Sequence, residues 1–321
     1  MAFLKDLFKG LLKLYTRFIF KALTLLFPQR LEINNIVLHL NNFQNDKPLT
    51  VVQLSDIHYD HTPLRMSDSF MDEIIEKTNK LKPDIIVITG DLVQFSPYPI
   101  KELYEKHLIR LKAKNGVYAI LGNHDYKTKE GPTVIRDQLL NTNIQLLQNE
   151  IVYPLGKGNG MIQLIGLGDY GKKKADFNIE KVRNEIESKK KNQYCKLVLS
   201  HNPDSIIDLK DSGLDLDLVL SGHSHGGQIC LPNGTPLLKF LDPWIAKLPT
   251  SILCRLPYPG KVVKHWEYAK GLHTVNSSNS NYPIKLYINK GLGTHPFGSI
   301  GPVRLFCHPE ITVFTIEPPK I

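Results

Sequence analysis

Seven side chains with metal-binding chemistry follow short apolar runs that are typical of β-strands. They are Asp56 and His58 after residues 50–54, Asp91 after 85–89, Asn123 after 117–121, His201 after 196–200, and His223 and His225 after 218–221. A lone histidine at one such position is more often a core or loop residue. Open α/β sheets place their sites where strands end, so the repetition at these strand ends predicts one shared metal site.

The donor atoms of these residues suit divalent transition metals. Two carboxylates, one amide oxygen and four imidazoles, with no thiolate, favour manganese. Iron or zinc are alternatives, and magnesium is less suited to so many nitrogens. Two divalent ions would carry more positive charge than Asp56 and Asp91 neutralise. The excess would attract a phosphate or pyrophosphate and acidify a bridging water. We therefore predict two divalent metal ions and a phosphorylated substrate.

The strands and helices that must position this site alternate along the sequence. Strand-like runs alternate with helical patterns, which is typical of βαβ units: strands at 50–54, 85–89 and 117–121, helices at 70–81 and near 101–112. Later strand-like runs have few helices between them, and lie at 162–165, 196–199, 218–220, 284–288 and 311–316. The sequence predicts an α/β fold with two mixed sheets.

Residues 231–274 form a segment of another kind. Six prolines interrupt an apolar stretch that contains Leu237, Phe240, Trp244 and Leu253. We interpret this segment as an apolar cap inserted beside the site. An ordinary loop that covers the core is the alternative.

Residues 1–30 are predicted to form an amphipathic helix that associates with a membrane. An apolar stretch rich in Leu and Phe is interrupted at intervals of four by Lys5, Lys9, Lys13, Arg17 and Lys21, which places the cations on one stripe. No run approaches the roughly 18 uncharged apolar residues of a spanning helix. The basic stripe would meet an anionic inner-leaflet membrane surface. A spanning anchor, or a helix that packs on this protein or on a neighbouring subunit, are the alternatives.

The composition of the chain limits the classes of molecule that it is expected to bind. The formal net charge of +9 and a pI near 9.2 favour an anionic partner. The body of the chain lacks the interleaved cations and aromatics of a nucleic-acid groove, so we predict no nucleic acid, and we infer no protein partner. The scattered Cys195, Cys230, Cys254 and Cys307 indicate reduced thiols in a cytosolic compartment.

Five motifs make the chain resemble the calcineurin-like metallophosphoesterase family over residues 51–316. The motifs are Asp56-Ile-His58, Gly90-Asp91, Gly122-Asn123-His124-Asp125, His201 and Gly222-His223-Ser-His225. The resemblance implies a four-layer α-β-β-α sandwich of two mixed sheets flanked by helices, formed by residues 31–321. It also implies a dinuclear metal-dependent hydrolysis of a phosphoester or phosphoanhydride.

The same resemblance implies a role for each site residue. Asp91 would bridge both metals, Asp56, His58 and His225 would complete one metal site, and Asn123, His201 and His223 would complete the other. His124 would be catalytic rather than a ligand, stabilising the transferring phosphoryl group or protonating the leaving oxygen. Asp125 would orient the His124 ring.

Two further motifs are similar to a membrane-associated branch of that family, typified by the bacterial phosphodiesterase YkuE. They are residues 223–228, and Gly291-Leu-Gly293-Thr with Pro302-Val-Arg304. Within this branch the basic-apolar N-terminus and the apolar cap most resemble chlamydial-type UDP-2,3-diacylglucosamine pyrophosphatases of lipid A synthesis. The enterobacterial form carries Arg at the position of His124, where this chain departs from it.

This resemblance implies a lipid-linked nucleotide-sugar substrate, cleaved to UMP and 2,3-diacylglucosamine 1-phosphate by a peripheral enzyme at the cytoplasmic face of the inner membrane. Arg304 would contact a phosphate, with a structural salt bridge as the alternative. A general phosphodiesterase or phosphatase acting on another substrate is the second hypothesis. A non-enzymatic scaffold is the third, and it is weakened because every ligand position is filled.

Overall fold

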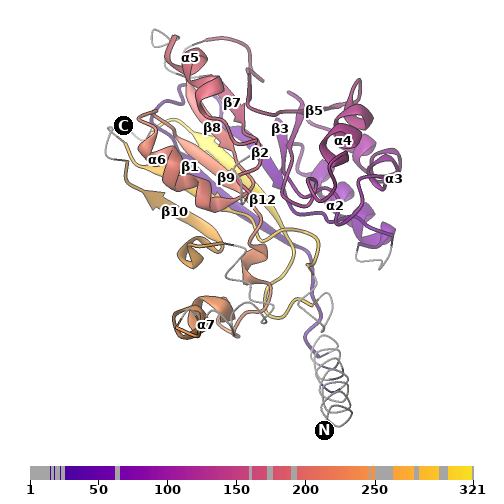
Figure 1. Ribbon diagram of the computed structural model, residues 1–321. Helices are drawn as coiled ribbons and strands as arrows, with labels where there is room; N and C mark the ends of the chain where they lie inside the picture. Colours follow the sequence, from indigo (N-terminus) through magenta and orange to yellow (C-terminus); the bar gives the residue numbers. More distant parts are fainter. Residues whose placement is uncertain are drawn as a thin grey trace.

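The structure is a computed structural model that describes residues 15, 18, 22, 26–61, 66–158, 161–171, 176–188, 194–245, 247–249, 263–277, 282–295 and 303–319. Within these ranges the chain forms two six-stranded sheets (Figure 1). The strands are β1 (Glu32–His39), β2 (Leu49–Leu54), β3 (Ile85–Thr89), β4 (Val117–Ile120), β5 (Ile144–Leu146), β6 (Glu150–Val152), β7 (Ile162–Gly166), β8 (Cys195–Leu199), β9 (Leu218–Ser221), β10 (Gly271–Val275), β11 (Ile284–Ile288) and β12 (Glu310–Glu317).

The helices lie mostly between these strands in sequence. The α-helices are α2 (Asp68–Lys80), α3 (Ile100–Lys106), α4 (Gly131–Leu139), α5 (Glu180–Ser188), α6 (Ile206–Asp211) and α7 (Leu237–Ile245). Short 3₁₀ turns are η1 (Leu108–Arg110), η2 (Pro203–Ser205), η3 (His225–Gly227) and η5 (Trp266–Tyr268).

Both sheets are mixed. The first has the order β1-β12-β2-β3-β4-β5, in which β12 runs antiparallel to β2 and the other neighbours are parallel. The second has the order β10-β11-β9-β8-β7-β6, in which the two outer pairs are antiparallel and the inner ones parallel. Since β2, β3, β4, β8 and β9 each lie in a parallel run, their carboxyl ends gather at one edge of each sheet.

Alternate side chains of the strands feed separate apolar layers. Val51 of β2 packs in the layer between the two sheets, together with Leu197 of β8. Its neighbour Val52 points to the other face and packs in a layer with Ile74 of α2. On the far side, Val198 of β8 packs in a layer with residues of α5 and α6. The chain is therefore a four-layer sandwich of helices, two mixed sheets and helices, as predicted.

The helix that follows β2 shows how local sequence sets these layers. Ser67 caps α2, because its hydroxyl accepts a hydrogen bond from the Phe70 amide at 3.2 Å. Met71, Ile74 and Ile75 then recur at helical spacing and are buried against the first sheet. The helix is thereby held on the outer face of the first sheet, where Figure 1 shows it beside α3 and α4.

Most of the predicted elements are confirmed. The runs at 50–54, 85–89, 117–121, 162–165, 196–199, 218–220, 284–288 and 311–316 are strands, and the helix predicted at 70–81 is α2. The helix predicted near 101–112 is shorter, because α3 ends at Lys106 and η1 follows. The expectation of few helices in the second half is wrong, since α5 and α6 cover the second sheet.

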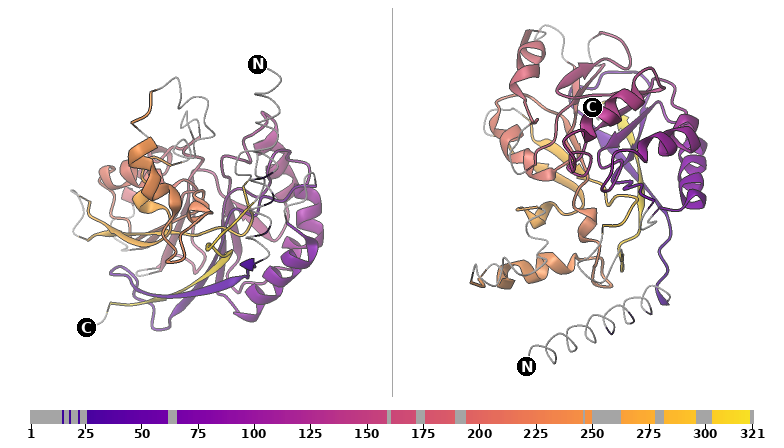
Figure 2. Two further views of the ribbon diagram at one scale, coloured as in Figure 1. Left: turned by 90° about the horizontal axis from the view of Figure 1, so that it is seen from below. Right: turned by 45° about the vertical axis from the view of Figure 1, so that its right-hand side comes forward.

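The predicted cap at residues 231–274 contains a helix and part of a strand. Helix α7 lies beyond the ends of the strands in Figure 1 and in the right-hand view of Figure 2. The upper boundary is corrected, because residues 271–274 belong to β10 of the second sheet. Residues 250–262 of the cap, Leu253 among them, and most of the predicted amphipathic helix at 1–30, lie outside the described residues. Among the described residues, no helix combines the length and apolar character needed to cross a membrane.

Candidate metal centre and active site

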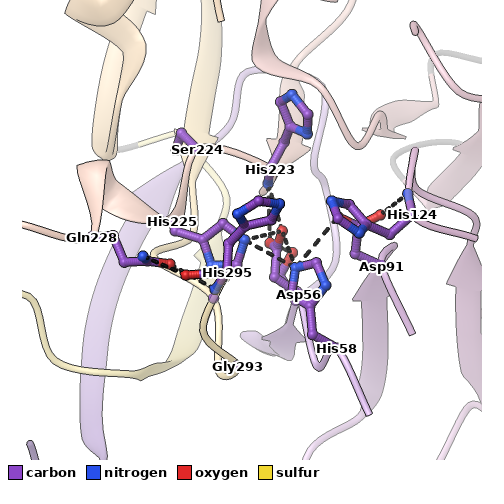
Figure 3. Close-up of polar contacts among 12 residues, drawn as sticks. Asp56, His58, Asp91, His124, His223, Ser224, His225, Gln228, Gly293 and His295 are labelled. Atoms are coloured by element: carbon purple, nitrogen blue, oxygen red, sulfur yellow. Dashed lines mark hydrogen bonds and ion pairs between the residues drawn. The ribbon is translucent and has the colours of Figure 1, made fainter. Parts of the chain in front are cut away.

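The predicted ligands meet at the carboxyl ends of strands from both sheets. Asp56 and His58 follow β2, Asp91 follows β3 and Asn123 follows β4, while His201 follows β8 and His223 and His225 follow β9. Figure 3 shows the side chains of Asp56, His58, Asp91 and His225 converging on one region. The two sheets therefore each contribute about half of the site.

One group of donors consists of Asp56, His58 and His225, whose ligand atoms all lie within 4.8 Å of one another. The Nε2 atoms of His58 and His225 face each other at 2.9 Å. Asp56 Oδ1 lies 3.5 Å from His225 Nε2 and 3.8 Å from His58 Nε2. All three side chains are buried. This is a compact set of one carboxylate and two imidazoles around a common centre.

A second group consists of Asp91, His201 and His223, with Asn123 beside it. Asp91 Oδ2 lies 3.2 Å from His201 Nε2 and 3.5 Å from His58 Nε2, which belongs to the first group. Asn123 Oδ1 lies 3.3 Å from His201 Nε2. Asp91 therefore stands between the two groups, at the place that a carboxylate shared by two metals would need.

Five of these residues have a backbone that L-residues rarely adopt. The φ angles of Asp56, His58, Asp91, His223 and His225 are 51°, 52°, 53°, 69° and 52°. Such angles cost free energy and persist where the surrounding structure enforces them, often at functional sites. Here they turn the chain sharply at the strand ends, so that each side chain points into the same region.

Close packing of the strand ends explains the glycine before Asp91. A Cβ at position 90 would lie 2.7 Å from His201 Nδ1 and 2.8 Å from the Gly122 amide nitrogen, and the φ of Gly90 is +91°. Only glycine allows both the conformation and this approach. The Thr89 carbonyl just before it lies 2.7 Å from His201 Nδ1, which leaves His201 Nε2 facing the site.

The electrostatics of the site keep its carboxylates ionised. Burial alone would raise the pKa of Asp56, but the neighbouring imidazoles of His225, His58 and His201 outweigh that effect and hold the pKa of Asp56 below its ordinary value. Burial likewise opposes ionisation of Asp91, yet the charge of His201 beside it holds the pKa of Asp91 well below the ordinary range. Two ionised carboxylates beside closely spaced imidazoles fit divalent cations of the borderline class.

His124 and Asp125 lie beside these groups, and one expectation about them is corrected. His124 Nδ1 is 2.9 Å from the carbonyl oxygen of Gln94, which fixes the ring. Asp125 does not orient that ring. Its carboxylate accepts hydrogen bonds from the backbone amides of Gly122 at 2.9 Å, Val93 at 3.1 Å and Leu92 at 3.3 Å. Asp125 therefore joins the loops after β3 and β4. Its carboxylate oxygens accept from backbone amides rather than from the His124 ring.

Arg304 lies behind the first group of donors. It is only 3% exposed, and its guanidinium donates to the carbonyl oxygens of Gly293, Gly291 and Lys290. Its Nη2 also lies 3.3 Å from His225 Nδ1. This placement favours a structural role close to a predicted ligand, and phosphate binding by Arg304 stays a prediction.

Two residues at this edge escaped the sequence reasoning. Asp169 follows β7, is 8% exposed, and has a buried Oδ1 without a hydrogen-bond partner among the described residues. Burial raises its pKa to about 6, against the charge of His201. His295 follows β11, and its ring centroid lies 5.0 Å from that of His124. Asp169 directly follows Gly168 after a buried strand, as Asp91, Asn123 and His223 also follow a glycine, and His295 lies two residues after Gly293 in the loop after β11.

Comparisons with known proteins agree with this geometry. A family model described as calcineurin-like phosphoesterase matches residues 49–227. YkoQ of Bacillus subtilis, an uncharacterized metallophosphoesterase, is 31% identical, and the match covers 84% of each chain. LpxG of Chlamydia trachomatis, a UDP-2,3-diacylglucosamine pyrophosphatase, is 30% identical over 76% of this chain and 78% of its own. YkuE of Bacillus subtilis, another uncharacterized metallophosphoesterase, is 30% identical over 83% of this chain and 78% of its own.

The family match spans more than half of the chain. The chain belongs to the calcineurin-like phosphoesterase family, and it is a metal-dependent phosphoesterase. The predicted resemblance is thereby confirmed, including its YkuE-like and chlamydial relatives.

Proposed function

We propose that this enzyme hydrolyses a lipid-linked nucleotide pyrophosphate at a membrane surface, with two manganese ions. UDP-2,3-diacylglucosamine is the substrate that fits best, and the products would be UMP and 2,3-diacylglucosamine 1-phosphate. The observation that carries this proposal is the exposed apolar stripe on helix α7 beside the site, and the similarity to chlamydial LpxG over most of both chains supports it. The enzyme would work peripherally at the cytoplasmic face of the inner membrane.

Helix α7 supports a lipid substrate. Phe240 and Trp244 stand four residues apart on this helix and are 63% and 70% exposed, and Leu248 beyond it is 37% exposed. Residues at this spacing share one helical face, so the exposed side chains form an apolar stripe. Exposed Lys239 and Lys247 lie beside the stripe, which suits an anionic lipid surface.

The stripe is tied closely to the metal centre. Pro236, which directly precedes α7, packs against Gly227, where a Cβ would lie 2.5 Å from the proline Cβ. The Leu237 amide donates to the Ile229 carbonyl oxygen at 2.9 Å. Gly227 is two residues from His225, so acyl chains held on α7 would leave the sugar phosphate near the predicted ligands.

The chain's own residues would divide the work. One metal ion would be held by Asp56, His58 and His225. The other would be held by Asn123, His201 and His223. Asp91 would contact both ions. When bound, such ions supply Lewis-acid chemistry to phosphoryl oxygens and to water. His124 would donate its Nδ1 proton to the Gln94 carbonyl, which leaves Nε2 to exchange a proton with the substrate.

In that role His124 must gain a proton before it can donate one to the substrate. Burial lowers its pKa to about 3, against the charge of Asp91, so the free imidazole is neutral. The negative charge of a bound phosphate group would raise the proton affinity of Nε2. His124 could then take up a proton as the substrate binds and deliver it to the leaving oxygen.

A general phosphodiesterase is the second candidate. YkoQ and YkuE are 31% and 30% identical to this chain, LpxG is 30% identical, and the matches to YkoQ and YkuE cover more of this chain than the match to LpxG does. Overall similarity therefore does not separate the two functions, and the difference must come from the surroundings of the site.

The test is hydrolysis of UDP-2,3-diacylglucosamine by detergent-purified enzyme with manganese, beside p-nitrophenyl phosphate and bis-p-nitrophenyl phosphate. UMP release at far higher efficiency than either generic ester supports the proposal. The double variant Phe240→Ser and Trp244→Ser should lower the ratio of lipid to generic turnover. Rapid turnover of the generic esters alone would reject the lipid substrate and favour the second candidate.

A further inference from the structure

The loop after β11 is fastened along the segment that carries Asp56. The Leu292 amide donates to the Ser55 carbonyl oxygen at 2.9 Å, and the Gly293 amide donates to that of Asp56 at 2.7 Å. A Cβ at position 293 would lie 2.2 Å from the Ile57 carbonyl oxygen. Only glycine permits this approach, so the loop and the ligand segment hold one another in register.

A buried guanidinium fixes the other edge of the same loop. Arg304 Nε and Nη2 donate to the Gly293 carbonyl oxygen at 3.0 and 2.5 Å, and Nη2 also reaches that of Gly291 at 3.1 Å. Its fork geometry holds two carbonyl groups at once. The course of the backbone from Gly291 to Gly293 is therefore set on both sides.

The side chain of Gln228 holds the backbone of His295, which lies two residues after Gly293. Its Nε2 donates to the His295 carbonyl oxygen, and its Oε1 accepts from the His295 amide, both at 2.7 Å. Figure 3 shows this pair of contacts. Gln228 itself has φ 59° and ψ −45°, a costly conformation for a residue with a side chain. Gln228 keeps this strained backbone while its side chain makes two hydrogen bonds with the His295 backbone. This indicates that the fold holds His295 in a defined position.

The clamp brings the His295 ring to the metal centre. Its centroid lies 5.0 Å from that of His124 with the rings almost perpendicular, 6.2 Å from His58 and 6.3 Å from His225. His295 is half-buried, whereas these three histidines are buried. It is therefore the imidazole of this cluster that an entering substrate can reach most directly.

We propose that His295 is a further substrate-binding residue, which donates an imidazole N–H to an oxygen of the substrate's phosphate groups, and that Gln228 is its positioning residue. A preorganised donor beside the reacting group stabilises the negative charge of phosphoryl oxygens. The inference rests on the phosphoesterase activity of the site. It does not depend on the lipid substrate.

The test uses the full-length, manganese-loaded enzyme with bis-p-nitrophenyl phosphate. His295→Ala should lower kcat/KM by roughly 100- to 1,000-fold, as loss of one oxyanion donor does, and His295→Gln should recover part of the activity. His295→Ala should also weaken binding of inorganic phosphate about tenfold, measured by calorimetry, whatever the preferred substrate. His39→Ala is the matched control, because His39 ends β1 at the opposite edge of the sheet.

Gln228→Ala should give a smaller loss than His295→Ala. The double variant should lose no more than His295→Ala alone, because Gln228 acts through His295. Additive losses would overturn the positioning role. Unchanged phosphate binding in His295→Ala, or loss of bound metal from it, would overturn the role of His295. If the lipid proves not to be a substrate while these losses occur, the inference stands and only the proposed substrate fails.

Discussion

Replacing Asp125 by alanine removes the acceptor that joins the loops after β3 and β4. Three buried amides, of Gly122, Leu92 and Val93, then lose their partner. Each unsatisfied amide costs about 1–3 kcal/mol. Burial and the charge of Asp91 raise the pKa of Asp125 to about 7, so removing the buried carboxyl recovers part of that cost. We expect the free energy of unfolding to fall by roughly 3–5 kcal/mol.

The assay is urea unfolding of the wild type and Asp125→Ala, both loaded with metal. Asp84→Ala is the control, because Asp84 accepts one backbone amide, that of Thr50 at 2.9 Å, at the amino end of β3. It should lose only about 0.5–1.5 kcal/mol and keep its kcat. If Asp125→Ala instead unfolded like the wild type while kcat collapsed, Asp125 would act on His124 directly and the loop-joining account would be refuted.

Two further variants test other parts of the site and the fold. His124→Ala should keep its bound metal while kcat falls by roughly 10² to 10⁴, as for loss of a general acid; elemental analysis beside steady-state kinetics checks this, and loss of both metals would show that His124 is a ligand. Burial raises the pKa of Asp217, which accepts from Asn42 and the Lys196 amide, above its ordinary value of 3.8. Its folded form holds the proton more tightly than the unfolded chain does, so the wild type should lose stability relative to Asp217→Asn as pH rises from that ordinary value through the folded pKa. Unfolding free energies across that range measure the difference, and a constant difference would count against the buried-charge explanation.

The sequence predicted the parts of the fold that have strong local signals. Strand β3 is buried on both faces, and its unbroken run of apolar residues is typical of a central parallel strand. Strand β1 was not predicted. Its exposed and half-buried side chains alternate at the sheet edge, and it pairs with β12 at the other end of the chain. Such a pairing is set by tertiary structure rather than by a local pattern.

Helix α7 was not predicted, because prolines lie within it and directly before it. Pro243 lies within the helix, where a proline removes one backbone hydrogen bond and usually ends a helical run. The carbonyl that loses this bond belongs to Lys239, which is exposed, so water can replace the missing donor. The irregular appearance of residues 231–274 therefore concealed a helix.

At the site, residue type and strand end located the seven predicted ligands, but not the partners that hold other residues in place. The hydrogen bond between His124 and Gln94 joins residues 30 positions apart. No spacing rule connects them, whereas the loops after neighbouring strands meet in space. Asp169 and His295 could have been found, because each lies in a loop after a buried strand, Asp169 directly after a glycine and His295 two residues after one. They were missed because they lie outside the motifs of the family resemblance.

We propose that Asp91 serves two metal ions, which Asp56, Asn123 and the surrounding histidines would also hold. The most direct measurement is the metal content of the purified, manganese-loaded chain and of Asp91→Ala, by elemental analysis after dialysis. We expect two ions per chain in the wild type and marked loss of both in Asp91→Ala, because Asp91 Oδ2 lies 3.2 Å from His201 Nε2 and 3.5 Å from His58 Nε2. A single retained ion in the wild type, or two in Asp91→Ala, would contradict this proposal.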